Sequence, residues 1–215
     1  MLKYPKIPYW PSSPARAAGD NIVGDPTRFT RTPVVVTEKL DGGNTLIHKG
    51  EVYGRSVSIP SVAKWMAMVR KHHAWKVTEA DIFLYGEDIY GVHSIEYDPV
   101  PENKTFYAFA LRFADGSFSS FQALVKYAEE RTISVVPVLY EGMFRSVNEI
   151  QNFVDRAHAE PSALGGAREG MVIRLARAFP AKEFHLNVCK SVREGHVQSD
   201  EHWSKHWRPC RIARG

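Results

Sequence analysis

The stretch PVVVTEKLDGGNTLI, from Pro33 to Ile47, places a lysine, an aspartate and two glycines directly after an apolar run. The β-branched residues Val34–Thr37 predict a short strand. Asp-Gly and Gly-Gly are common turn pairs, so one interpretation is a hairpin start with a solvated lysine beside the turn. The other is that the turn aims Lys39 at a ligand as a nucleophile. Gly42 and Gly43 suit both interpretations, because glycine adopts positive φ and permits close backbone approach.

The composition is that of an ordinary globular protein. The chain has 215 residues, 44% of them hydrophobic, which is enough for one large domain or two small ones. Its net charge of +4 is too mild to prove an anionic partner, although positive charge gathers towards both ends. Two cysteines and no signal sequence suggest a reducing, cytoplasmic setting. No apolar run approaches the roughly 18 residues of a membrane span, so we expect no membrane contact and a monomer.

Hydrophobic periodicity predicts an α+β fold with mostly antiparallel strands and flanking helices. A hairpin is expected around Lys49-Gly50. The predicted strands are Val34–Thr37, Thr45–His48, Glu51–Arg55, Ile82–Tyr85, Phe106–Leu111, Thr132–Val138, Met171–Leu175 and Phe184–Cys189. The predicted helices carry buried faces at Val62, Trp65, Met66 and Val69, at Phe121, Leu124, Val125 and Ala128, and at Ile150, Phe153, Val154 and Ala157, the last behind a Ser146/Glu149 capping box.

Lys39-Leu40-Asp41-Gly42 is weak as a lone motif, but other short motifs follow it in order. They are Val52-Tyr53-Gly54-Arg55-Ser56, Leu84-Tyr85-Gly86-Glu87, Phe106-Tyr107-Ala108-Phe109, Glu169-Gly170-Met171-Val172-Ile173-Arg174 and Val188-Cys189-Lys190. This series resembles the covalent nucleotidyltransferase superfamily of polynucleotide ligases and capping enzymes. The resemblance covers residues 34–193 and is strongest to ATP-dependent RNA ligases of the RNA ligase 2 type. Asn44 favours that type, because DNA ligases usually carry arginine at the same offset from the lysine.

The resemblance implies an ATP-grasp-like ligase adenylation fold in a single adenylyltransferase domain, residues 1–215. Residues 1–33 form an irregular, aromatic-anchored lead-in and residues 194–215 a basic C-terminal segment. About 25 residues follow Lys190, too few for the five-stranded OB domain of DNA ligases and capping enzymes, so none is expected.

The resemblance also assigns roles to the motif residues. Lys39 is the nucleophile that forms lysyl-AMP, Phe109 stacks on adenine, and Lys190 holds the α-phosphate. Glu87 contacts the ribose or a metal-bound water, and Glu169 faces the hydrated Mg²⁺. The full set of ATP-binding candidates is Glu38, Lys39, Asn44, Arg55, Glu87, Phe109, Glu169 and Lys190, with Glu87 and Glu169 as metal candidates and Arg55 and Arg193 as nucleic-acid contacts.

Elementary chemistry supports these roles. An amine that attacks phosphorus must be neutral, so we expect the pKa of Lys39 to be lowered by burial or by a nearby cation. Lys190, Arg174 or a metal ion are the candidate cations. Carboxylates such as those of Glu87 and Glu169 serve a triphosphate site only where they hold hard cations or ribose hydroxyls. In isolation each of these residues would more often be a solvated side chain.

The chain departs from the family pattern in two motifs. The usual K-x-K pair is absent, because Val188 and Val192 flank Lys190, and Arg193 is the expected substitute for the second phosphate contact. Ala110 stands where the family often has aspartate. A group near the C-terminus, His196, His202, His206 and Cys210, fits no usual zinc spacing, so we expect a basic, tryptophan-containing segment that contacts nucleic acid or packs on the domain.

The sequence therefore favours an ATP-dependent RNA ligase that uses ATP and Mg²⁺ or Mn²⁺ and joins 5′-phosphate to 3′-hydroxyl RNA ends. Two alternatives stay open. One is a DNA ligase or another polynucleotide-modifying nucleotidyltransferase acting on DNA ends, and the other is a non-catalytic nucleic-acid-binding module.

Overall fold

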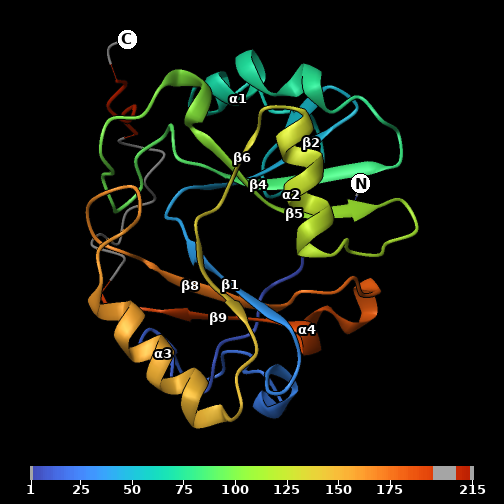
Figure 1. Ribbon diagram of the computed structural model, residues 1–215. Coiled ribbons are helices and arrows are strands. Elements are labelled where there is room, and N and C mark those ends of the chain that lie inside the picture. The colour runs from blue at the N-terminus through green and yellow to red at the C-terminus, as the bar shows by residue number, and fades with distance from the viewer. Residues whose placement is uncertain (1, 196–206, 214–215) are drawn as a thin grey trace.

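The computed structural model describes residues 2–195 and 207–213, and it consists of two sheets with flanking helices (Figure 1). The four-stranded sheet runs in the order β7 (Val138–Gly142), β1 (Val34–Lys39), β8 (Gly170–Leu175) and β9 (Val188–Val192). The five-stranded sheet runs β3 (Glu51–Tyr53), β2 (Gly43–His48), β4 (Ile82–Asp88), β5 (Phe106–Phe113) and β6 (Ser134–Val135). Only β5 and β6 pair in parallel among these strands, which confirms the predicted α+β fold.

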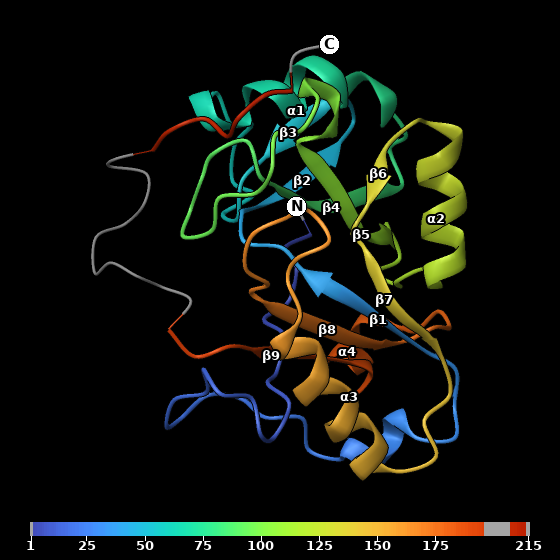
Figure 2. The ribbon, with the colours of Figure 1, turned by 60° about the vertical axis from the view of Figure 1, so that its left-hand side comes forward.

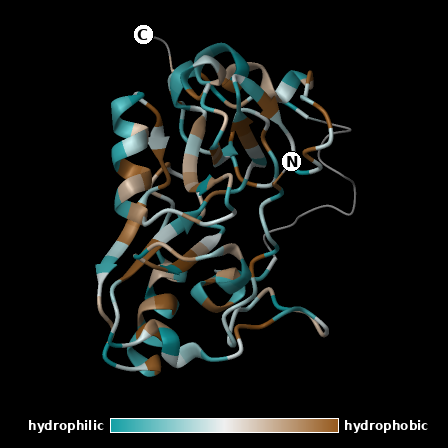
Figure 3. Ribbon diagram, turned by 90° about the vertical axis from the view of Figure 1, so that its right-hand side faces the viewer, coloured by the Kyte–Doolittle hydropathy of each residue, from teal (hydrophilic) through white to brown (hydrophobic). Residues whose placement is uncertain are grey.

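Helices cover the outer faces of the two sheets. α2 (Phe121–Glu130) packs on the five-stranded sheet and α3 (Val147–Ala159) on the four-stranded sheet, each through its apolar face. The shorter helices are α1 (Ala67–His72) and α4 (Phe184–Asn187), together with 3₁₀ turns at Pro26–Phe29, Lys64–Met66, Ala74–Lys76, Glu102–Lys104 and Ala181–Glu183. The helices carry both hydrophilic and hydrophobic residues along their length, as expected for helices with one buried face (Figure 3). Among the described residues no helix is long and apolar enough to cross a membrane.

The link after Lys39 is not the predicted hairpin turn. β1 and β2 belong to different sheets, so Leu40–Gly42 carries the chain from one sheet to the other. Neither Gly42 nor Gly43 has a positive φ, so the left-handed conformation that glycine permits is not used at this link. Gly42 is required by space instead, because a Cβ there would lie 2.5 Å from the backbone oxygen of Asp88 on β4.

The hairpin predicted around Lys49-Gly50 is confirmed. β2 and β3 pair antiparallel from Leu46↔Tyr53 to His48↔Glu51. Lys49 and Gly50 both have positive φ, at 51° and 75°. Two such residues form the turn whose twist matches that of paired strands.

Three predicted elements differ from the structure. Thr132–Val138 is not one strand, because Pro137 lacks the N–H needed for a continuous ladder and separates β6 from β7. Phe184–Cys189 begins as helix α4 and becomes β9 only at Val188. Val62 does not share the buried face of its helix: it is 89% exposed and precedes the first helical turn, which starts at Lys64.

The capping box before α3 is confirmed in part. The Ser146 side chain accepts a hydrogen bond from the Glu149 N–H, as predicted. The Glu149 carboxylate reaches back one residue further than expected and accepts from the Arg145 N–H at 2.6 Å. Both bonds satisfy N–H groups that the helix itself leaves without partners.

Both ends of the chain pack on the domain. The lead-in is anchored by Trp10, which is 1% exposed and donates from Nε1 to Gln151 on α3. The predicted His196/His202/His206 group lies outside the described residues. Cys210 is buried against the loop after β4, and Arg208 and Arg211 form ion pairs with Glu96 of that loop.

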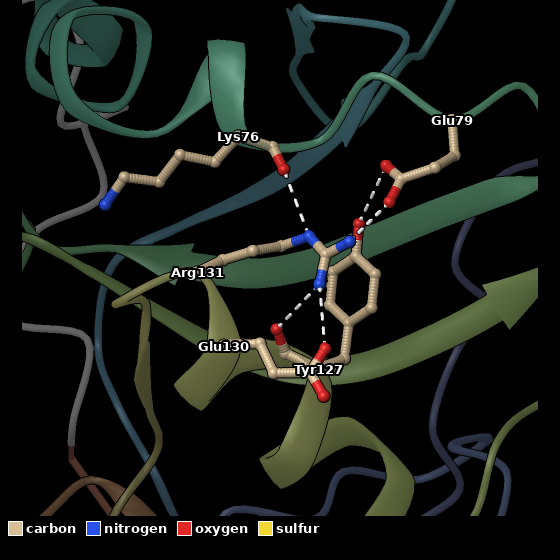
Figure 4. A network of polar contacts seen from close by, with 5 residues as sticks. All are labelled: Lys76, Glu79, Tyr127, Glu130 and Arg131. Carbon is tan, nitrogen blue, oxygen red and sulfur yellow. Dashed lines mark hydrogen bonds and ion pairs between the residues drawn. The ribbon is translucent and has the colours of Figure 1, made fainter.

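A polar network ties the end of α2 to the loop before β4 (Figure 4). The Arg131 guanidinium lies 3.7 Å from the centroid of the Tyr127 ring and donates to Glu79 at 2.6 Å and to the Lys76 carbonyl at 3.2 Å. The Tyr127 hydroxyl also donates to Glu79. No local pattern in the sequence predicts this network, because Lys76 and Glu79 lie about 50 positions before Tyr127 and Arg131.

Candidate active site

A cleft of about 1300 Å³ opens between the two sheets. Seven of the predicted site residues line it: Glu38, Lys39, Asn44, Arg55, Glu87, Phe109 and Lys190. Glu169 joins them through a direct contact with Lys39. Arg193 is the exception, because it does not line the cleft.

Lys39 ends β1 at the mouth of the crossing between the sheets. Its Nζ donates to Oε2 of Glu169 at 2.8 Å, and Glu169 immediately precedes β8, which pairs with β1. Burial alone would lower the pKa of Lys39, but the carboxylates of Glu169 and Glu87 outweigh it and hold the pKa above its ordinary value. The expected lowering is therefore wrong for the protein without ligands: Lys39 is a paired ammonium.

Glu87 and Glu169 approach Lys39 from different sheets. Burial, together with the negative charge of Glu169, raises the pKa of Glu87 to about 8, despite the opposing effect of Lys39. Because each negative charge disfavours the other, the two carboxylates would both ionise more easily beside a further cation. Such a pair suits a divalent ion. No group of three His, Cys, Asp or Glu side chains able to hold a metal occurs in residues 2–195 and 207–213. Two glutamates fit Mg²⁺ better than a full protein cage, since Mg²⁺ usually keeps water and phosphate ligands.

Lys190 lies on β9. In the sheet, β8 separates β9 from β1, the strand that carries Lys39. Its Nζ is 4.1 Å from the centroid of the Tyr9 ring. Burial, helped by the charge of Lys39, lowers the pKa of Lys190 to about 8. Of the three cations expected near Lys39, Lys190 is thus the one whose charge is felt there, whereas Arg174 lies further along β8 and donates to the Phe109 carbonyl.

Arg193 has a different position from the predicted phosphate contact. Its backbone N–H donates to the Glu169 carbonyl at 2.9 Å, so it helps to fix the residue that pairs with Lys39. Its Nε is buried and has no hydrogen-bond partner in the described part of the chain.

The remaining predicted residues surround the cleft. Asn44 lies opposite Glu87 in the β2–β4 register. The Phe109 ring packs edge-on against Tyr4 at 4.9 Å between centroids. Arg55 is exposed directly after β3.

Glu38 is held away from solvent beside the cleft. It is 1% exposed, and its Oε2 accepts a hydrogen bond from the Ala163 N–H at 3.0 Å, with the Arg168 Nε at 3.9 Å. Its Oε1 is buried and has no hydrogen-bond partner within the described ranges. A buried acceptor of this kind can bind a donor on a ligand.

Sequence reasoning missed the role of Asp41. Its Oδ2 accepts from the N–H groups of Ser94 and Ile95, both at 2.7 Å, and its own N–H donates to the Tyr97 hydroxyl. Asp41 therefore fastens the loop after β4 to the Lys39 crossing. No sequence signal could reveal this, because the partners are more than 50 positions away.

The N-terminal residues were also missed as part of the cleft. Lys3, Tyr4, Pro5, Lys6 and Ile7 line it beside the motif residues. Their aromatic and basic character was visible in the sequence, but their position between the two sheets was not.

Comparisons with known proteins bear on the family and the fold. Residues 32–192 match the family model described as RNA ligase. A search of curated proteins gives no match. The fold resembles a Naegleria gruberi RNA ligase solved with pyrophosphate (TM-score 0.59, 17% identity, 90% of this chain and 58% of that chain), a putative ATP-dependent DNA ligase from Aquifex aeolicus (0.53, 17%, 90% and 50%) and an archaeal ATP-dependent RNA ligase (0.53, 13%, 90% and 48%).

The chain thus spans about half to three fifths of the length of these solved ligases. At such identities the structural likeness defines the fold alone. The family match covers the strands that carry Lys39, Glu87 and Lys190, and also Glu169, which directly precedes β8. On that match, the chain belongs to the RNA ligase family.

Proposed function

We propose that this chain acts as an ATP-dependent RNA ligase that joins 5′-phosphate and 3′-hydroxyl ends through a lysyl-AMP intermediate. The observation that carries the proposal is the position of Lys39, ion-paired with Glu169 in a cleft that also contains Glu87 and Lys190. An amine, two carboxylates and a second amine are the groups that nucleotidyl transfer from a triphosphate requires.

In the first step the Lys39 Nζ attacks the α-phosphorus of ATP. A P–N bond forms, the P–O bond to the β-phosphate breaks, and pyrophosphate leaves. The ammonium must lose a proton before the attack, and Glu169 Oε2, at 2.8 Å, can accept it. Lys190 binds the α-phosphate and offsets the charge that develops on its oxygens.

Glu87 and Glu169 would hold Mg²⁺ or Mn²⁺. That cation would neutralise phosphate charge and weaken the effect of the two carboxylates on Lys39, so the pKa of the amine would fall. Phe109, on β5, offers its ring to the adenine, and Glu38 and Asn44 offer polar groups to the nucleoside. These roles are proposals that rest on side chains lining the same cleft.

The later steps transfer AMP to the nucleic acid. A 5′-phosphate oxygen attacks the phosphorus of lysyl-AMP, the P–N bond breaks, and a 5′–5′ phosphoanhydride forms. A 3′-hydroxyl then attacks the 5′-phosphate, loses its proton and releases AMP as the phosphodiester forms. Arg55, exposed at the cleft, is the proposed contact for the strand end, and Asn44 favours RNA.

The direct test is incubation with α-³²P-ATP and Mg²⁺ or Mn²⁺. We expect a covalent protein–AMP adduct that is stable to denaturation and absent from Lys39→Ala. Lys104→Ala, which removes an exposed lysine far from the cleft lining, should form the adduct normally. Absence of any adduct with ATP would contradict the proposal and favour a binding module, and a GMP adduct from GTP would favour capping chemistry.

A nick-sealing panel tests the polymer. The substrates are duplexes with a single nick in which the 5′-phosphate strand and the 3′-hydroxyl strand are each RNA or DNA. Sealing that requires RNA at the 3′-hydroxyl side supports the RNA ligase proposal. Equal or better sealing of all-DNA nicks would instead make the chain a DNA ligase.

A further inference from the structure

The N-terminal arm, residues 2–10, precedes the stretch that matches the family model, yet it is built into the cleft. Residues 3–7 line the cleft, and in Figure 2 the dark blue beginning of the described chain passes between the five-stranded sheet and the strands β8 and β9. The Leu2 carbonyl accepts from the Tyr85 hydroxyl at 2.5 Å, and the Lys3 carbonyl accepts from Arg112 Nη1 at 3.2 Å. The arm is therefore bonded to the five-stranded sheet at its start.

The end of the arm is bonded to β9, on the other sheet. The Lys190 N–H donates to the Pro8 carbonyl at 2.9 Å, and the Trp10 N–H donates to the Lys190 carbonyl at 2.7 Å. These two bonds bracket Tyr9 and place it opposite Lys190. Trp10, with its buried ring, fixes the same point from the side of α3.

The side chains complete this pairing. The Lys190 Nζ lies 4.1 Å from the centroid of the Tyr9 ring, and within the described residues it forms no ion pair. An aromatic face attracts an ammonium group and restricts its position without cancelling its charge. A carboxylate in the same place would have neutralised the lysine and competed with a phosphate.

We propose that Tyr9 is a positioning residue: its ring holds the Lys190 ammonium over the cleft, ready to bind the α-phosphate of ATP. This inference rests on the proposed function, because it assigns Tyr9 a role in the same adenylylation step. It adds a contribution from outside the family match, supplied by the N-terminal arm.

The test is single-turnover adenylylation at varied ATP concentration. Tyr9→Leu should reduce kcat/KM by about tenfold, mostly through a higher KM for ATP, because a mobile Lys190 binds the phosphate less well. Tyr9→Phe keeps the ring face and should retain most of the rate. Tyr140→Leu is the matched control, since Tyr140 stacks on Phe144 beside α3 and does not line the cleft.

A double-mutant cycle separates positioning from general structural damage. If Tyr9 acts through Lys190, Tyr9→Leu should cause no further loss in a Lys190→Met background. Multiplicative losses in the double variant, or a Tyr9→Leu enzyme as active as wild type, would overturn the inference. Tyr9→Met, with an unbranched side chain, replaces Tyr9→Leu if thermal unfolding shows that the latter is not folded.

The outcome for the proposed function is read separately. If the wild-type protein forms no adduct, the proposed function fails. If the wild type forms the adduct and Lys190→Met forms it at a clearly reduced rate, while Tyr9→Leu has no effect, only the role of Tyr9 fails.

Discussion

Lys39 and Lys190 reach the same cleft from strands separated by β8 alone, but their surroundings are opposite. Lys39 lies beside the carboxylates of Glu169 and Glu87, which raise its pKa, and we call this part of the cleft the carboxylate end. Lys190 lies beside the Tyr9 ring, in a part of the cleft that we call the aromatic end, and burial there lowers its pKa to about 8. The residue type is the same, so the neighbours set the difference in pKa between the two lysines.

This difference bears on the order of events in the proposed reaction. Without ligands, the proposed nucleophile is protonated and paired, and the proposed phosphate-binding lysine is the easier one to deprotonate. Binding of ATP with a divalent cation must reverse this, because phosphate charge favours the ammonium form of Lys190 and the cation competes for the carboxylates beside Lys39. Under the proposed function, Lys39 would therefore become nucleophilic only when ATP and the cation are bound.

Glu169→Gln should have the largest effect on this arrangement. Removing the carboxylate takes away the proton acceptor at 2.8 Å and half of the proposed cation site, so we expect adenylylation to fall by about 10²–10³-fold. Single-turnover adduct formation measures this. Glu160→Gln, which changes a mostly exposed glutamate, is the control and should stay near the wild-type rate. An equal loss in both variants would show that the carboxylate end has no special role.

Amine labelling compares the two lysines directly. At pH 8 in the absence of nucleotide, we expect Lys190 to react with a small amine reagent at least about 100-fold faster than Lys39, because only neutral amines react. Peptide mass spectrometry over pH 7–11 follows the titration of Lys190, while Lys39 should stay largely unreactive over the same range. In Glu169→Gln the reactivity of Lys39 should rise while that of Lys190 changes little. Similar titration of both lysines in the wild type would contradict the comparison.

Gly42→Ala tests how tightly the carboxylate end is assembled. The new Cβ would lie 2.5 Å from the Asp88 backbone oxygen and 3.1 Å from the Glu87 Cγ, so β4 must shift away from Lys39. We expect the free energy of unfolding to fall by about 1–3 kcal/mol, as in other overpacked sites. Gly43→Ala is the matched control, since its nearest neighbour is at 3.8 Å, and chemical denaturation should show a clearly smaller change.

The same glycine shows what could be predicted from the sequence. The strands around Lys39, the Lys49-Gly50 hairpin and the amphipathic helices followed from local patterns, because periodicity and turn residues are local properties. The crossing at Gly42 did not, because its reason is a contact with β4, more than 40 positions later. The order of motifs identified the family. It did not show that the carboxylates of Glu169 and Glu87 lie beside Lys39, so the direction of the Lys39 pKa shift was predicted wrongly.

The N-terminal arm illustrates the same limit at the aromatic end. Its composition predicted an irregular, aromatic-anchored segment, and Trp10 confirms this. Nothing local to YPKIPYW indicates that Tyr9 lies opposite Lys190, since that pairing depends on a strand 181 positions away. Residues that join a site from a distant segment of the chain can be identified only once the topology is known.

Asp88→Asn should give the smallest effect, one of stability rather than activity. Burial raises the pKa of Asp88 to about 8, so between about pH 4 and pH 8 the folded protein holds a proton that the unfolded chain has lost. This contribution to stability is complete below the unfolded pKa and is lost as pH rises through 8.

The asparagine variant keeps an acceptor for the Tyr90 N–H and cannot ionise. We therefore expect it to be more stable than the wild type at pH 8, on the order of 1 kcal/mol, with the difference vanishing near pH 4. Urea denaturation at both pH values measures this, and Asp81→Asn, an exposed aspartate just before β4, is the control. Because Glu87 adds a slope of the same sign, only the difference between variant and wild type isolates Asp88. A variant that is equally or less stable at pH 8 would show that the carboxylate end carries no such strain from buried charge.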